Sequence, residues 1–100
     1  MVIIEGIFVV EPAQRAAFLA GRLDAMRRSR AEPGCLAYTF CADPLDPARV
    51  LLFERWADQG SLDGHLSSLR DQPRSADAGV TATSSTLTVY DVTGERPLGG

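Results

Sequence analysis

Four segments of the chain are rich in β-branched and aromatic residues, which favour strands. They span residues 2–10, 35–42, 49–56 and 85–92. In the second segment large apolar side chains alternate with smaller ones, as expected where successive side chains point to opposite faces of a sheet. Asp-Pro turn signals in 43–48 then predict that the second and third segments form a hairpin.

Two other segments carry apolar residues at the three-and-four spacing of a helix. The first spans 12–31 and opens with Pro12, which suits a first helical turn; its expected apolar stripe is Ala16, Leu19, Ala20, Leu23 and Met26. Its arginines are expected to form a solvated face or, alternatively, a basic ligand patch: Arg15, Arg22, Arg27, Arg28 and Arg30. Asp58 is expected to cap a shorter second helix with the stripe Leu62, Leu66 and Leu69, beside which lies His65. The stretch 72–83 has the composition of a frayed turn and a loop.

The order strand, helix, strand, strand, helix, strand predicts an α+β, ferredoxin-like βαββαβ fold with a four-stranded antiparallel sheet. We expect one domain over 1–93 and a C-terminal tail over 94–100. Two helices cover only one face of a sheet roughly 19 Å wide. Both alternating sets of side chains in 2–10 and 49–56 are nevertheless largely apolar. A homodimer through the sheet face is therefore expected.

Composition narrows the class of protein. A chain of 100 residues with 45% hydrophobic and 23% charged residues is typical of one folded globular domain. Its net charge of −3 has the wrong sign for holding phosphate backbones, so nucleic acid is not an expected partner. No run approaches the roughly 18 apolar residues that span a bilayer. The opening residues lack a basic segment followed by an apolar stretch, so we expect no secretory signal. We expect no membrane partner and a cytoplasmic location.

The cysteines and the histidine do not predict a metal site or a disulfide. Cys35 and Cys41 lie in one expected strand, roughly 20 Å apart, and cannot pair within the chain. Together with the one histidine, His65, they give no ligand set of ordinary metal-binding spacing. We expect no bound metal.

Several short motifs occur in a fixed order. They are Glu32-Pro33-Gly34-Cys35-Leu36-x-Tyr38, Asp43-Pro44, Glu54-Arg55-Trp56-x-Asp58 and Leu62-x-x-His65-Leu66. With them the segment from Val2 to Leu69 resembles the antibiotic biosynthesis monooxygenase (ABM) family, which includes quinol monooxygenase-like dimeric α/β-barrel proteins. The resemblance implies a dimeric α/β barrel, no cofactor, and a small aromatic substrate that is polyketide-derived or quinol-like. Members often carry a second histidine after the first, and here Arg70 stands in that place.

His65 and Trp56 are the expected catalytic residues. Histidine changes charge near neutral pH, so His65 is the leading candidate for the base that deprotonates an enol or phenol. Alternatively, His65 packs beside the leucines and bonds to a backbone carbonyl or to Glu54. Trp56 can stack on a flat ring and offer its indole N–H to a substrate oxygen, or it can serve core packing or a dimer contact.

Tyr38, Phe53 and Glu54 are the expected substrate-binding residues, and Tyr38 can donate a hydrogen bond to a developing oxyanion. Glu54 and Arg55 are neighbours in a strand and must face opposite ways, so one of them enters a buried layer. A buried carboxylate needs a partner or a raised pKa, which makes Glu5 and Glu54 secondary base candidates or arginine partners.

Three functions remain open at this point. The first is a cofactor-independent monooxygenase that acts on a hydroxylated aromatic compound. The second is a non-catalytic protein that binds such compounds, and the third is a structural dimeric α/β-barrel protein.

Overall fold

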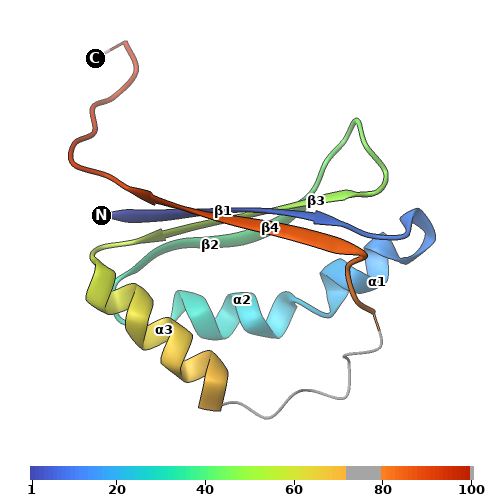
Figure 1. Cartoon of the computed structure of the whole chain (residues 1–100), viewed down its shortest axis with the longest axis horizontal. Coiled ribbons are helices and arrows are strands. Elements are labelled where there is room, and N and C mark those ends of the chain that lie inside the picture. The colour runs from blue at the N-terminus through green and yellow to red at the C-terminus, as the bar shows by residue number, and fades with distance from the viewer. Residues whose placement is uncertain (72–79, 100) are drawn as a thin grey trace.

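The computed structural model describes residues 1–71 and 80–99 and confirms the ferredoxin-like arrangement. Its four strands form one antiparallel sheet in the order β2-β3-β1-β4, with all α-helices on one side (Figure 1). The elements in chain order are β1 (Val2–Val9), η1 (Pro12–Gln14), α1 (Arg15–Ala20), α2 (Leu23–Arg30), β2 (Cys35–Ala42), β3 (Arg49–Trp56), α3 (Gln59–Asp71) and β4 (Ser84–Asp91). None of the helices in the described residues is long and apolar enough to cross a membrane.

The two faces of the sheet differ in burial. On the helix-covered face the side chains of β1 and β3 are almost fully buried and form the core with Tyr38 and Leu62: Val2, Ile4, Val50, Leu52 and Trp56. The intervening residues of the same two strands form the open face, on which Ile3, Ile7, Leu51 and Phe53 retain exposure. Of the two largely apolar sets of side chains in these strands, one is therefore buried under the helices and the other retains exposure to solvent.

The first predicted helix is divided into three pieces, so the prediction of one continuous helix was wrong. The α-helical part is interrupted at Gly21 and Arg22, where glycine has low helix propensity. The buried side of this segment also differs from the predicted stripe. Phe18, which the predicted stripe omitted, is only 1% exposed, whereas Ala16, Ala20 and Leu23 are exposed.

Two of the arginines expected to face solvent also bond to other segments of the chain; Arg30 remains exposed, whereas Arg15 is half-buried. Arg15 donates from Nη1 to the backbone carbonyls of the β2–β3 loop at Asp43 and Asp46. Arg30 donates from Nε to the carbonyl of Tyr38 at 2.8 Å. The helical layer is thereby tied to β2 and its hairpin.

The second predicted helix is longer than expected and only its first half packs against the sheet. Leu62 and His65 are buried, but Leu66 and Leu69 are 44% and 45% exposed, so the predicted leucine stripe was wrong in its second half. The reason is the direction of α3, which leaves the end of β3 and runs away from the sheet (Figure 1). The loop predicted over 72–83 lies outside the described residues up to position 79.

Candidate functional site

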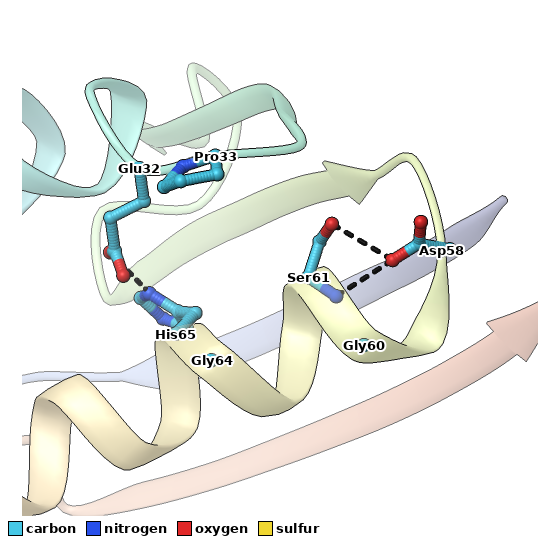
Figure 2. A pocket seen from close by; sticks show the side chains of 7 residues that line it. All are labelled: Glu32, Pro33, Asp58, Gly60, Ser61, Gly64 and His65. Carbon is cyan, nitrogen blue, oxygen red and sulfur yellow. Dashed lines mark hydrogen bonds and ion pairs between the residues drawn. The ribbon is translucent and has the colours of Figure 1, made fainter.

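A pocket of about 360 Å³ lies between the first half of α3 and the turn that leads into β2 (Figure 2). It is lined by Glu32, Pro33, Asp58, Gly60, Ser61, Gly64 and His65. The residues come from two segments that are far apart in the chain and meet here: the turn before β2 and the start of α3 with its capping residue.

The start of α3 is fixed by Asp58, as predicted. Its Oδ1 accepts the backbone N–H of Ser61 at 2.7 Å and the Ser61 hydroxyl at 2.8 Å (Figure 2). These bonds to the ionised form hold the pKa of the Asp58 carboxyl below its ordinary value. Asp58 therefore keeps a negative charge at this end of the pocket.

The turn on the other side of the pocket depends on Gly34. Its φ is 79°, a left-handed conformation that glycine adopts without strain. A Cβ at this position would collide with the side chain of Ser61. The Gly34 carbonyl also accepts the N–H of Ala57 at 2.8 Å, which joins the turn to the end of β3. Glycine thus allows the turn and α3 to approach closely.

His65 lies at the inner wall of the pocket between two carboxylates. Its Nδ1 lies 2.8 Å from Glu32 Oε1, and its Nε2 lies 3.9 Å from Glu54 Oε1. The His65 side chain is 2% exposed and that of Glu32 is 22% exposed, so Glu32 is the member of the pair that solvent reaches. A neutral imidazole has one donor and one acceptor nitrogen, whereas the protonated ring has an N–H on both: one within hydrogen-bond distance of Glu32 and one 3.9 Å from Glu54, close enough for a charge interaction only.

The bond to Glu32 differs from the prediction, in which the structural partner of His65 was a backbone carbonyl or Glu54. The available signal was the position of Glu32 at the start of the Glu-Pro-Gly-Cys motif, directly before a turn that demands glycine. Nothing in local spacing joins that motif to a histidine 33 residues later.

Trp56 lies behind His65 and not in the pocket. Its ring is fully buried, with its centre 4.7 Å from that of His65 and the two planes 33° apart. Its indole Nε1–H donates to Glu54 Oε1 at 3.0 Å. The expected contact of this indole with a ligand is therefore replaced by contacts with His65 and Glu54.

Glu54 and Tyr38 complete the buried layer. Glu54 is the member of the Glu54–Arg55 pair that enters the covered side, and burial raises the pKa of its carboxyl, although the Trp56 hydrogen bond acts in the opposite direction. Its bonded partner is Trp56, so the suggested pairing with an arginine was wrong. Tyr38 packs with its ring centre 5.4 Å from that of His65. Burial, followed by the nearby Glu54 charge, raises its pKa to about 12, so its hydroxyl stays protonated.

Phe53 and Glu5 lie on the open face of the sheet, away from this cluster. Phe53 precedes Glu54 in β3, so the alternation of the strand turns its ring to the opposite side, where it is 43% exposed. In this chain Phe53 therefore cannot line the same pocket as His65. Glu5 is exposed and accepts a bond from the Tyr90 hydroxyl at 3.4 Å, so the expectation of a buried carboxylate at position 5 was wrong.

The described residues hold no group of three or more histidine, cysteine or carboxylate side chains arranged to bind a metal ion. Cys35 and Cys41 are both free. What the site offers is acid–base chemistry: one imidazole between two carboxylates, next to a small pocket.

Comparison with known proteins gives matches of sequence and of structure. A family model described as antibiotic biosynthesis monooxygenase matches residues 1–72. The uncharacterized protein sll1783 of Synechocystis is 31% identical over 67 residues, which are 67% of this chain and 46% of that protein. The chain thus spans about half the length of this curated relative.

Three solved structures illustrate the structural matches. A Deinococcus radiodurans protein assigned as an antibiotic biosynthesis monooxygenase has a TM-score of 0.79 at 24% identity, covering 97% of each chain. Rv0793 of Mycobacterium tuberculosis has a TM-score of 0.68 at 26% identity, covering 96% of this chain and 98% of that one. The heme degrader MhuD of the same organism, with two hemes bound, has a TM-score of 0.73 at 12% identity, covering 97% of this chain and 100% of that one.

Proposed function

Because this chain belongs to the antibiotic biosynthesis monooxygenase family, we propose that it is a cofactor-independent monooxygenase of a hydroxylated aromatic, polyketide-derived or quinol-like compound. Family membership supports a monooxygenase or small-molecule-binding role. The observation that carries the narrower proposal is the arrangement of His65, the one histidine of the chain, at a pocket wall with a carboxylate on each side.

The proposed reaction begins with a proton transfer. A phenol or enol in the pocket gives its proton to the Glu32–His65 pair, and the proton is then held on the imidazole, where both N–H groups face carboxylates. Glu32 orients the ring through Nδ1, as carboxylates do in other acid–base sites. The positive charge that forms on His65 is balanced by Glu32 and Glu54, which lowers the cost of deprotonating the ligand.

The electron-rich anion then reacts with dioxygen. It passes one electron to dioxygen, and the two radicals combine to form a carbon–oxygen bond. Uptake of the stored proton gives a hydroperoxide, which loses one molecule of water and leaves a quinone. Substrate and dioxygen thus yield an oxidised product with one added oxygen atom and with two hydrogens lost as water. The substrate supplies all the electrons in this sequence.

Trp56, Tyr38 and Glu54 act in this proposal through His65. The Trp56 ring packs against the imidazole, and its N–H fixes the Glu54 carboxylate on the far side. The Tyr38 ring packs against the same imidazole and excludes water from it. We assign all three as positioning residues, and we place Phe53 at an interface between two chains.

That interface is part of the proposal. The open face carries apolar side chains on its two central strands, and a second copy of the chain would cover them. We propose a homodimer that associates through this face, so that each chain keeps its own pocket on the helix-covered side.

A binding role without catalysis is the second candidate. The observation that favours it is the burial of Trp56 and Tyr38 behind His65, which leaves Glu32 as the side chain of this cluster that a ligand meets first. A ligand can be held there without any transfer of electrons to dioxygen.

Oxygen consumption separates the two candidates. Purified, metal-stripped protein is supplied with anthrones and quinols, alongside the variants His65→Gln and Ser67→Ala. Ser67 is exposed on the same helix and serves as the control. The proposal predicts oxygen uptake that falls at least about a hundredfold in His65→Gln, in line with the loss of a general base, and is unchanged in Ser67→Ala. Ligand binding without any oxygen uptake would support the binding role.

A further inference from the structure

The pocket has an unusual charge lining for a site that takes small aromatic compounds. Glu32 and Asp58 contribute carboxylates, and no arginine is present among the described residues that line it. Asp58 is held in its ionised form by two bonds from Ser61. An anionic ligand would meet repulsion from both sides.

The feature of the pocket that would attract an anion is already occupied. The first turn of α3 borders the pocket, and a helix N-terminus carries unpaired N–H groups and a partial positive charge. Here the Asp58 carboxylate caps that turn and accepts the Ser61 N–H at 2.7 Å. A carboxylated ligand would have to displace this built-in anion.

The wall that α3 presents to the pocket suits a flat ring. Gly60 and Gly64 are four residues apart and lie on one face of the helix. A Cβ at Gly64 would meet no atom within 4 Å, so space is open in front of its backbone. Pro33 faces them from the other side as an apolar surface (Figure 2).

Within the Glu32–His65 pair, Glu32 is the group that such a ligand meets first, because its side chain is 22% exposed while that of His65 is 2% exposed. A carboxylate accepts hydrogen bonds and donates none. Its second oxygen, Oε2, is not engaged by His65, whose contact is made with Oε1. A ligand that fits must therefore supply a donor, and a hydroxyl on an aromatic ring does so.

We infer that the pocket selects uncharged, flat ligands whose ring hydroxyl donates to Glu32, and that it rejects carboxylated analogues of the same ring. The inference rests on the proposed function, since it names the ligand class for the same pocket. Glu32 is the residue that sets this specificity, and Asp58 adds to it from the capped end of α3.

Two isosteric probes test the selection. They are 2,5-dihydroxyphenylacetamide, which is uncharged, and 2,5-dihydroxyphenylacetate, which is ionised at neutral pH. Their dissociation constants are measured by calorimetry under nitrogen, so that no oxidation occurs. We expect the acetate to bind at least about tenfold more weakly, as a unit charge near the Glu32 carboxylate implies.

Three variants locate the source of the discrimination. Glu32→Gln keeps the size of the side chain and an oxygen for His65, and it should reduce the ratio of the two dissociation constants about tenfold. Asp58→Asn keeps a capping residue and should reduce the ratio less, because Asp58 is exposed and screened by solvent. Asp24→Asn removes the same charge from the exposed start of α2 and should leave the ratio unchanged.

Equal affinity for the two probes would overturn the inference, as would a ratio that survives both Glu32→Gln and Asp58→Asn, or the failure of both probes to bind. Oxygen uptake, measured separately in air, distinguishes this result from the proposed function. Selective binding of the acetamide without oxygen uptake would refute the monooxygenase and support the selection. Equal turnover of both probes would support the monooxygenase and overturn the selection.

Discussion

The two faces of the sheet differ in burial, and neighbouring residues of β3 show the contrast. Trp56 and Glu54 on the covered face are 0% and 6% exposed, whereas Phe53 on the open face is 43% exposed. The covered face is completed by helices of the same chain and contains the His65 cluster. The open face is apolar along its centre, and none of the helices in residues 1–71 and 80–99 lies above it.

Because of this difference, residues on the covered face should affect the stability of the single chain, whereas residues on the open face should affect its association with a second chain. A side chain on the covered face is already surrounded, so removing it leaves a cavity or an unpaired polar group. A side chain on the open face contributes little to a single chain, and its burial depends on a partner. Substitutions of the same kind on the two faces should therefore have different effects.

Truncation of Trp56 should give the largest effect. Trp56→Ala removes a fully buried ring and the hydrogen-bond donor of Glu54, so we expect a loss of about 3–5 kcal/mol in the free energy of unfolding. Phe53→Ala, three residues earlier on the open face, should cost about 1 kcal/mol in dilute protein. Urea unfolding followed by circular dichroism measures both. Equal losses would contradict the division between the faces.

A charge on the open face should act on assembly. Phe53→Glu places a carboxylate where a second chain would pack, and we expect the dimer dissociation constant to rise at least about a hundredfold. Leu45→Glu is the matched control, because Leu45 is 95% exposed in the β2–β3 loop. Sedimentation equilibrium measures the dissociation constant. A wild-type chain that stays monomeric at high concentration would refute the proposed dimer.

The turn that closes the covered side should tolerate no side chain at position 34. Gly34→Ala introduces a Cβ at a φ of 79° and against Ser61, and we expect a loss of about 1–3 kcal/mol. Gly64→Ala, in a helix with open space around it, should stabilise the protein by up to about 1 kcal/mol. Thermal unfolding of the two variants gives the comparison. A Gly34→Ala protein as stable as wild type would show that the turn can move away from α3.

The smallest effect concerns pH. Burial raises the pKa of Glu54, so above the ordinary carboxyl pKa the folded state binds more protons than the unfolded state, and stability falls as pH rises toward the folded pKa. Glu54→Gln should remove this fall in stability.

Asp58 should have the opposite effect on the pH profile. Hydrogen bonds lower the pKa of Asp58, so its contribution to folding stability is present above its ordinary pKa and is lost as pH falls through the folded pKa. Asp58→Asn should remove that loss. Urea midpoints across acidic and neutral pH should show the two variants changing the profile in opposite directions.

The strands were predictable because their signals are local. The ranges 35–42 and 49–56 coincide with β2 and β3, since alternation and Asp-Pro turns define both ends without reference to the rest of the chain. The break at Gly21 was not predicted. One glycine in a long amphipathic segment is compatible with a continuous helix, and the sheet beneath decides where the helix turns.

The site was predictable in its residue types but not in its pairing. The motifs indicated His65, Trp56, Tyr38 and Glu54, and the structure brings these four together. The alternation of side chains along a strand predicts that Phe53 and Glu54 point in opposite directions. Which of the two is covered depends on where the helices pack. The contact between Glu32 and His65 arises from two segments that fold against each other, and neither segment alone carries a signal for it.

Indole fluorescence in this protein comes from one side chain, since Trp56 is the only tryptophan, and its ring lies 4.7 Å from the only histidine. An imidazolium is a far better electron acceptor for an excited indole than a neutral imidazole is, so a proton arriving on His65 should dim the emission. The protein thus contains an optical reporter of its own acid–base state, and stopped-flow emission would time the proton transfer without any added label.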